Sequence, residues 1–259
     1  MKVEQTCKIL SKRQLNAYAV EMDLAVGDMV RASLTGPGQF VHVKCGEGRL
    51  LRRPISVCKW RACEDSDTLT IVFEVRGEGT QWLARRPVGH SVDVLGLLGR
   101  GFQIEAGETY LLVGGGIGVP PLLGCAGSCD GAATAILGFR SKDRALLLDE
   151  FSGSCADVQV ATDDGTLGHR GYVDQLLRQE LAGERRYRGI LACGPKPMLK
   201  SVVKAAAEYG VPCQVSMEER MACGVGACLG CAVQMAGGGM KHVCKDVPVF
   251  DAGEVDWNA

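Results

Sequence analysis

Three features that would direct a protein to a membrane, out of the cell or to a polyanion are missing from this chain of 259 residues. No apolar run approaches a membrane span, which needs about 20 residues. The opening residues, MKVEQTCKIL, are polar and lack the apolar centre of a secretory signal peptide. The formal net charge is only -1, so no general attraction to nucleic acid or anionic lipid is expected. We therefore expect a cytoplasmic protein without a nucleic-acid or membrane partner.

Cysteine, in contrast, is abundant, with 13 residues. Nine of them are scattered, odd in number and without a pairing pattern, which favours a reducing compartment where thiols act as small buried apolar groups. The other four are close together near the C-terminus, with the spacing C-x4-C-x2-C, then twelve intervening residues and a fourth cysteine. They are Cys223, Cys228, Cys231 and Cys244.

This spacing is typical of a plant-type [2Fe–2S] cluster, which needs four soft anionic ligands around one small body. Gly224, Gly226 and Gly230 lie between the first three cysteines, where the loop must curl tightly and some φ angles can be positive. Backbone N–H groups there are free to point at the sulfurs. A zinc site or a disulfide knot is the alternative, but zinc usually takes two C-x2-C pairs and only one is present. We expect these four cysteines to be the metal ligands.

Residues 1–101 are predicted to form an antiparallel β-barrel, because short apolar or alternating segments follow one another with Gly and Pro between them. Two motifs in this region are candidate binding elements, and the second begins a helix whose N-terminus could hold a pyrophosphate. One is Arg53-Pro54-Ile55-Ser56, and the other is the GEGT sequence that ends in Gly79 and Thr80 at the start of an expected helix. Each motif is weak alone, since an arginine before proline is usually a solvated charge and a GxG is usually a turn. The expected strands are 17–24, 39–43, 54–60, 69–75 and 91–95.

Residues 102–216 change to strand–helix alternation, which predicts an open parallel sheet with ligands at the carboxyl ends of its strands. The first strand runs into a glycine loop containing Gly114, Gly115, Gly116 and Gly118, followed by a helix that Pro120 can begin. The loop departs from the strict G-x-G-x-x-G pattern at its last glycine. Another strand end carries Cys193, Gly194 and Pro195. The expected strands are 110–114, 134–139, 158–162, 189–193 and 211–216, and the expected helices are 145–151, 172–181 and 198–209.

Residues 217–259 contain the four clustered cysteines, and a piece of this size needs a metal centre to be stable alone. The last part, VFDAGEVDW at 249–257, is interpreted as a docking tail anchored by Phe250 and Trp257. A frayed terminus is an equally good interpretation of it.

The chain resembles the ferredoxin–NADP reductase superfamily along nearly its whole length. The resemblance lies in the order of its motifs, which are RPIS, GEGT, GGGIG, CGP and the C-terminal cysteines. More closely, the chain resembles the family of electron-transfer subunits of NAD-dependent dihydroorotate dehydrogenase B. The segments that carry this closer resemblance are LLRRPIS, MACGVGACLGC, and HVCKDVPVF followed by DAGEVDW. The resemblance implies three domains: an FAD-binding barrel (1–101), an NAD-binding α/β domain (102–216), and a [2Fe–2S] domain with a partner-docking tail (217–259).

The same resemblance implies the roles of individual residues. Arg53 would hold the FAD pyrophosphate, with Pro54 and Ile55 beside it and Ser56 near flavin N5. Val72, Phe73 and Glu74 would line the flavin or its ribityl chain, and Gly79 and Thr80 would contact the pyrophosphate. Gly114, Gly115, Gly116 and Gly118 on one side, and Cys193, Gly194 and Pro195 on the other, would bracket the nicotinamide nucleotide. Val247 stands where the family has glycine, which could alter the loop beside the cluster.

The implied function is to pass electrons from a dihydroorotate-oxidising FMN subunit, through [2Fe–2S] and FAD, to NAD⁺ in pyrimidine (UMP) biosynthesis. The partner would be that FMN-containing catalytic subunit, in a heterotetramer of two plus two chains. Arg140, Lys142 and Arg144 could accept a 2′-phosphate, although the family favours NAD. Two alternatives stay open: a related NAD(P)H-dependent reductase subunit serving ferredoxin or sulfur reduction, and a non-enzymatic redox or zinc module that binds nucleotide for regulation.

Overall fold

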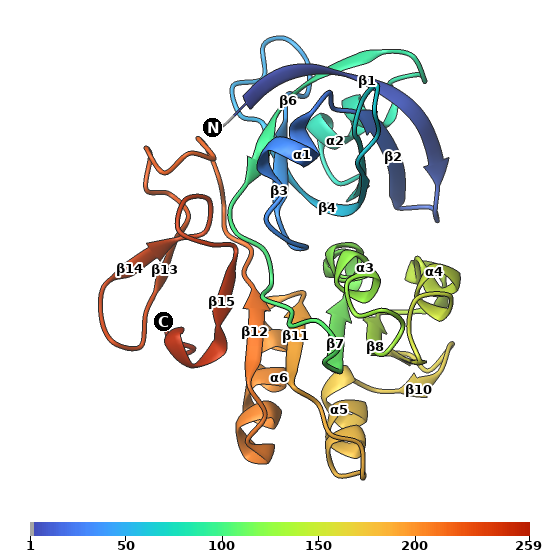
Figure 1. Cartoon of the computed structure of the whole chain (residues 1–259), viewed down its shortest axis with the longest axis vertical. Helices are drawn as coiled ribbons and strands as arrows, with labels where there is room; N and C mark the ends of the chain where they lie inside the picture. Colours follow the sequence, from blue (N-terminus) through green and yellow to red (C-terminus); the bar gives the residue numbers. More distant parts are fainter. Residues whose placement is uncertain (1–2) are drawn as a thin grey trace.

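The computed structural model describes residues 3–259, which form a β-barrel above a layered α/β unit, with the C-terminal segment beside both (Figure 1). The barrel is closed and antiparallel, with strand order β1-β2-β5-β4-β3-β6. Two short helices lie in its connections. The elements are β1 (Val3–Gln14), β2 (Ala19–Ala25), α1 (Met29–Ser33), β3 (Phe40–Val43), β4 (Arg53–Arg61), β5 (Thr68–Glu74), α2 (Glu78–Ala84) and β6 (Ser91–Leu98).

The barrel forms because its strands carry apolar side chains on alternate positions. In β2, Val20, Met22 and Leu24 are buried while Glu21 and Asp23 are not. The inward side chains of all six strands fill one core, so the barrel interior is packed and its ligands must lie on the outside or at the rim.

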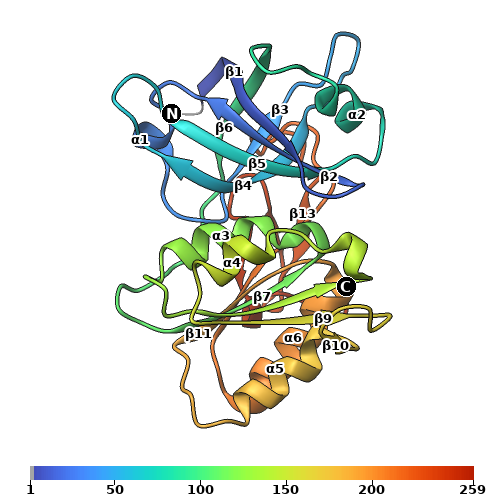
Figure 2. The ribbon, with the colours of Figure 1, turned by 90° about the vertical axis from the view of Figure 1, so that its right-hand side faces the viewer.

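The second unit is a seven-stranded sheet of order β10-β9-β8-β7-β11-β12-β15, in which only the β12–β15 pair is antiparallel within the described chain. Helices cover both faces: α3 and α4 lie between the sheet and the barrel, and α5 and α6 lie on the far side (Figure 2). The strands up to β12 are β7 (Tyr110–Gly115), β8 (Thr134–Phe139), β9 (Asp157–Thr162), β10 (His169–Arg170), β11 (Gly189–Cys193) and β12 (Cys213–Ser216). The helices are η1 (Gly116–Gly118), α3 (Pro120–Gly127), η2 (Lys142–Arg144), α4 (Leu148–Ser152), α5 (Val173–Leu181) and α6 (Lys196–Tyr209).

Local sequence explains the bounds of α6. The helix begins directly after Pro195, with Pro197 in its first turn, where a missing N–H costs nothing. It ends at Gly210, whose φ of 66° is the left-handed conformation that commonly closes a helix. Its buried face, which includes Leu199 and Val202, packs on the sheet.

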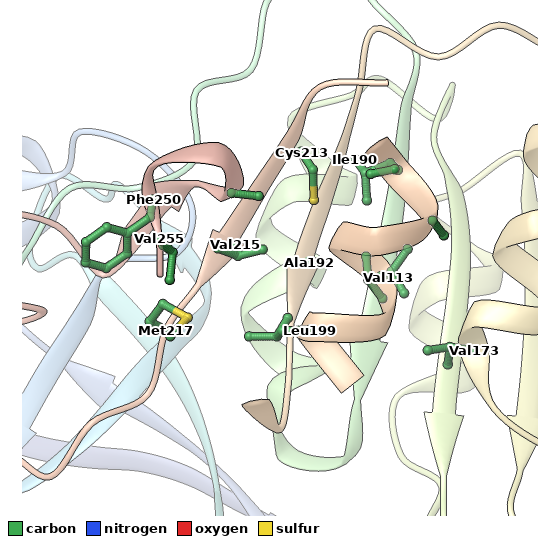
Figure 3. Close-up of a cluster of buried hydrophobic side chains, with 14 of the residues drawn as sticks. Val113, Val173, Ile190, Ala192, Leu199, Cys213, Val215, Met217, Phe250 and Val255 are labelled. Carbon is green, nitrogen blue, oxygen red and sulfur yellow. The ribbon is translucent and has the colours of Figure 1, made fainter. Parts of the chain in front are cut away.

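The C-terminal segment leaves the sheet after β12, forms the hairpin of β13 (Ala232–Gln234) and β14 (Met240–His242), and returns as β15 (Val249–Asp251) and η3 (Ala252–Glu254). Phe250 and Val255 pack with Met217 and Val215 beside the sheet (Figure 3). Trp257 donates its indole N–H to Ala252 O at 2.9 Å. The tail is therefore docked on the chain's own sheet, with Phe250 buried.

The predicted fold class is confirmed, with a closed antiparallel barrel followed by a mainly parallel sheet. Elements not anticipated from the sequence are β1, α1, β10 and the short C-terminal strands. In the part of the chain that the structure describes, no helix is both long enough and apolar enough to cross a membrane.

Candidate functional site

A cavity of about 740 Å³ opens between the barrel and the carboxyl ends of the sheet strands. It is large enough for a dinucleotide-sized portion of a cofactor. Both units contribute to its wall, so the cavity exists only because the barrel sits over the sheet. Predicted site residues in the wall are Glu74 from the barrel and Gly115, Gly116, Gly118, Gly194 and Pro195 from the sheet.

The glycine ends of β7 and β11 meet at the floor of this cavity. Gly114 and Cys193 are register partners on the two parallel strands. A Cβ placed on Gly118 would lie 2.5 Å from Cys193 O and 2.7 Å from the Cα of Gly194. Only glycine lets the two backbones approach so closely, and this approach leaves room for a phosphate against them.

The turn after β7 continues into helical structure. η1 passes directly into α3, whose first residue is Pro120. Gly114 lies beneath this helix, because a Cβ there would be 2.9 Å from Val119 Cγ2 and 3.1 Å from Leu122 Cδ1. Gly114 therefore serves close strand–helix packing rather than the cavity wall.

The two weak barrel motifs lie side by side. A Cβ on Gly79 would be 2.7 Å from Arg53 Nε and 3.0 Å from Nη2, so the guanidinium lies over the start of α2. Thr80 Oγ1 accepts the backbone N–H of Arg76 at 3.0 Å and that of Gly77 at 3.3 Å, which fixes the first turn of the helix. A cationic fork beside a glycine-started helix can hold a pyrophosphate.

Other predicted barrel residues are placed differently. The side chains of Ile55 and Phe73 are buried in the barrel core, and Val72 packs in the cluster that contains α3. These three side chains are almost fully buried, so their contact with a ligand at the surface of the barrel would come mainly from backbone atoms. Pro54 is exposed and Ser56 half-buried on β4.

Glu218 and Cys193 are two titratable groups close to the cavity. Glu218 lines the cavity, and its side chain is reached by solvent from the cleft. Protein surrounds the carboxyl on its other sides, and this burial raises its pKa above the usual range. Arg76 opposes this rise and Glu74 adds to it. Burial, with a smaller contribution from Glu218, raises the pKa of Cys193 to about 12, so its thiol is protonated at neutral pH and is not a nucleophile.

The raised pKa of Glu218 predicts a pH dependence of stability. The folded chain holds the Glu218 proton more tightly than the unfolded chain, so this contribution is full below pH 4.5 and is lost as the pH rises through the raised value. We expect Glu218→Gln to gain thermal stability relative to the unmodified chain as the pH rises from 4.5 to 8, measured as Tm at each pH. Glu184→Gln, at an exposed position, is the matched control, and its Tm should differ from that of the unmodified chain by the same amount at every pH. A difference between Glu218→Gln and the unmodified chain that also stays constant with pH would contradict the prediction.

The four clustered cysteines lie in the loop after β12. Cys223 Sγ accepts three backbone N–H groups, from Val225, Ala227 and Cys228, at 3.3–3.4 Å. Although burial opposes ionisation, these hydrogen bonds lower the pKa of Cys223 to about 6. Cys231 Sγ accepts the N–H of Cys244 at 3.4 Å. Such N–H donors stabilise the thiolates that an iron–sulfur cluster requires.

The Cys228 side chain is close to Cys223, and that of Cys231 is close to Cys244, while Cys223 is also near enough to Cys244 to affect its ionisation. Within residues 3–259, no three or more His, Cys, Asp or Glu side chains converge to hold a single metal ion. A two-iron cluster instead takes two protein ligands per iron, which the paired arrangement fits.

Backbone conformation in this loop follows the glycines. Gly224 has a φ of 69° and Gly226 a φ of 83°, whereas the next positive φ belongs to Leu229 rather than to Gly230. Val247 is not among the described residues with positive φ, and it packs against the core instead. The valine is therefore accommodated without the strain that its place in the sequence suggested.

Several cavity residues escaped the sequence analysis, among them Asn16, Tyr18 and Glu218. Arg144 stacks on the ring of Tyr18, with Cζ 3.1 Å from the ring centroid, and Asn16 Nδ2 donates to Arg144 O at 3.3 Å. These contacts join the barrel to the sheet beside the cavity. They could not be predicted, because each connects residues more than 100 positions apart.

Comparison with known proteins adds independent information. Residues 218–256 match the family described as the iron–sulfur cluster binding domain of dihydroorotate dehydrogenase B. The chain is 37% identical to the dihydroorotate dehydrogenase B (NAD(+)) electron transfer subunit of Caldanaerobacter subterraneus, over 98% of this chain and 99% of the relative. It is 40% identical to the protein of that name from Geobacillus thermodenitrificans, over 95% and 96%.

Solved structures show the same fold. A chain from a study of flavin-based electron bifurcation by NADH-dependent reduced ferredoxin-NADP oxidoreductase superposes with a TM-score of 0.86 and 32% identity, covering 97% of this chain and 90% of that one. The ferredoxin NADP⁺ reductase of Neisseria gonorrhoeae, with bound FAD and NADP, has a TM-score of 0.64 at 17% identity, over 80% and 92% of the chains. The latter similarity concerns the fold alone.

Proposed function

Because the chain belongs to the family of dihydroorotate dehydrogenase B (NAD(+)) electron transfer subunits, we propose that it carries electrons from a dihydroorotate-oxidising partner, through [2Fe–2S] and FAD, to NAD⁺. The observation that carries this proposal is identity of 37–40% over 95–98% of the chain, with all four clustered cysteines inside the matched iron–sulfur domain. The chain is an oxidoreductase subunit, and the FMN-containing catalytic subunit is its partner. We expect a heterotetramer of two plus two chains, serving pyrimidine (UMP) biosynthesis.

The three groups supply complementary chemistry when bound: the cluster carries single electrons, nicotinamide carries a hydride, and FAD exchanges both. The chain's own part is to bind these groups at fixed places and to exclude water between them. A strong acid or base is not required of it, which agrees with the protonated thiol of Cys193 directly beneath the cavity floor.

For FAD, we propose that Arg53 and the N–H groups of Gly79 and Thr80 hold the pyrophosphate. The adjacency of Arg53 to Gly79 supports this assignment. The backbone of Pro54, Ile55 and Ser56 would run beside the flavin. Val72 and Phe73 would contribute backbone atoms, and Glu74, which lines the cavity, would lie toward the ribityl chain.

For NAD, we propose the floor formed by the glycine ends of β7 and β11. Gly115, Gly116 and Gly118 would face Gly194 and Pro195 across the nucleotide, all five in the cavity wall. Gly114 and Cys193, which are register partners on β7 and β11, would support this floor from beneath without touching the nucleotide. Arg140 and Arg144 lie in the same wall as Asp163, and the preference for NAD is proposed from the family alone.

For the cluster, we propose Cys223 and Cys228 as ligands of one iron, and Cys231 and Cys244 as ligands of the other. We also propose domain limits of 1–101, 102–216 and 217–259, with β15 of the third returning to the sheet of the second. A reducing cytoplasm suits a chain in which none of the thirteen cysteines forms a disulfide.

The division of labour between the subunits provides a direct test. The holoprotein should reduce an artificial dye with NADH, yet oxidise dihydroorotate only after the FMN subunit is added, because the relatives of this chain are named as electron transfer subunits. The measurement is dye reduction and NADH formation, each with and without the partner. Oxidation of dihydroorotate by this chain alone would refute the proposal.

A second candidate is supported by the 32% identity to a chain studied in NADH-dependent ferredoxin-NADP oxidoreductase. In that case the chain would exchange electrons with a ferredoxin-linked partner. The same assay separates the two: addition of the dihydroorotate-oxidising subunit couples dihydroorotate to NADH only in the first case.

A further inference from the structure

His42 on β3 is a buried polar residue that the proposed function does not use. Its side chain is fully buried, and neither Nδ1 nor Nε2 has a hydrogen-bond partner among the described residues. A buried imidazole without partners is costly to folding, so an unpaired ring at this depth calls for an acceptor that the polypeptide itself does not supply.

The ring lies against the cluster loop. A Cβ placed on Gly224 would be 2.8 Å from both Cε1 and Nδ1 of His42, and 3.1 Å from Nε2. Gly224 directly follows Cys223 and holds a φ of 69°, so glycine is needed there both for the turn and for the histidine.

Within the barrel, His42 lies on the strand that pairs with the one proposed to hold the flavin. It is the register partner of Pro54 on β4, between Arg53 and Ile55. Its ring centroid is 5.7 Å from that of Phe40. His42 therefore lies against the loop of the four cysteines and, through its backbone, pairs with the barrel strand of the RPIS motif.

The ring is neutral under physiological conditions, because burial, helped by the charge of Arg52, lowers the pKa of His42 to about 4. A neutral imidazole has one N–H donor and one acceptor nitrogen. Burial is compatible with a place at the cluster, since the proposed ligands Cys231 and Cys244 are only 1% and 2% exposed.

We propose that His42 is a positioning residue of the [2Fe–2S] centre, whose ring supports Gly224 and whose N–H donates a hydrogen bond to a sulfur of the cluster. The proposal rests on the proposed cluster site. Thiolate and sulfide sulfurs are the acceptors that the cluster brings to this loop, and they are the missing partners of a donor already in place. Because a donated hydrogen bond stabilises the more negative, reduced cluster, His42 would raise its reduction potential.

Magnetic resonance of the holoprotein tests the hydrogen bond without an activity assay. Iron and sulfide are first quantified, because a chain without them refutes the cluster site and this proposal together. With histidine labelled by ¹⁵N, the reduced, paramagnetic cluster should show coupling to a histidine nitrogen in pulsed EPR. The coupling should be lost in His42→Gln and kept in His242→Gln, whose wild-type ring lies 3.4 Å from Asp246 Oδ2 within the cluster segment.

The reduction potential provides the second measurement. In His42→Leu, which removes the donor, the equilibrium constant for cluster reduction should fall about tenfold, or about 59 mV for one electron. His42→Gln, which keeps an N–H donor, should recover part of this change, and His90→Gln at an exposed position should change nothing.

Two results would overturn the proposal while leaving the cluster site intact. One is a fully loaded cluster with no ¹⁵N coupling, or with coupling that survives replacement of His42. The other is a His42→Leu protein that keeps its potential and only loses heat stability, which would reduce His42 to a packing residue. If His42→Leu does not fold, the labelled unmodified protein decides.

Discussion

Replacing Cys228 by serine is expected to lower dihydroorotate-dependent NADH formation in the assembled complex by at least about a hundredfold. Cys228 is one of the four proposed ligands, and a serine oxygen is too hard a donor to replace a thiolate on iron. Without a complete cluster, electrons from the partner cannot reach the flavin site, while the nucleotide cavity between barrel and sheet is untouched. NADH-dependent dye reduction by the isolated chain should therefore remain within about twofold of normal.

The matched control is Cys63→Ser, a half-buried thiol in the barrel, far in sequence from the cluster loop. It should retain both iron and activity. Iron content and the visible spectrum are measured beside the two assays. Full iron loading and unimpaired coupling in Cys228→Ser would show that the ligand assignment is wrong.

Removal of the Arg53 side chain has the other large expected effect, on FAD rather than on iron. A guanidinium hydrogen-bonded to a pyrophosphate contributes about 3 kcal/mol, so Arg53→Ala should weaken FAD binding by more than about a hundredfold. The protein should lose flavin during gel filtration and regain activity when excess FAD is added. The titration of apoprotein with FAD, followed by flavin fluorescence, measures the change.

Arg61→Ala, at the exposed far end of the same strand, is the appropriate comparison because it removes an equal charge from β4. Its FAD affinity should match that of the unmodified chain. Equal affinities for all three proteins would place the pyrophosphate elsewhere and would leave the Arg53–Gly79 contact a purely structural one.

Most strands and helices of the fold could be predicted from the sequence, because each has a recognisable local pattern. β8 and β11 have the predicted bounds, since each is a short apolar run ended by a glycine turn or helix signal. β1 was missed for the opposite reason: its buried Cys7 and Ile9 are surrounded by polar residues, and its pairing with β2 and β6 stabilises it. β10 and β15 are too short for any periodicity to show.

The residues of the candidate site were predictable where they belong to a contiguous motif and not where they stand alone in the sequence. The glycine loops and the four cysteines are contiguous patterns with a chemical meaning, so they could be selected from the sequence. His42 and Glu218 are single residues whose importance depends on what the fold brings against them. Nothing near His42 in the chain indicates Gly224, which is distant in sequence and adjacent in space.

The iron-binding segment is fastened at both of its ends. It departs from β12 and comes back as β15 on that same strand, where Met217 N–H bonds to Pro248 O at 2.8 Å. Its termini are thus already held together, and most of the entropy of closing the loop has been lost before any iron arrives. The apoprotein should therefore stay folded when oxidants remove the iron. Reassembly of the cluster should then need only the binding of iron and sulfide in this loop, without refolding of the segment.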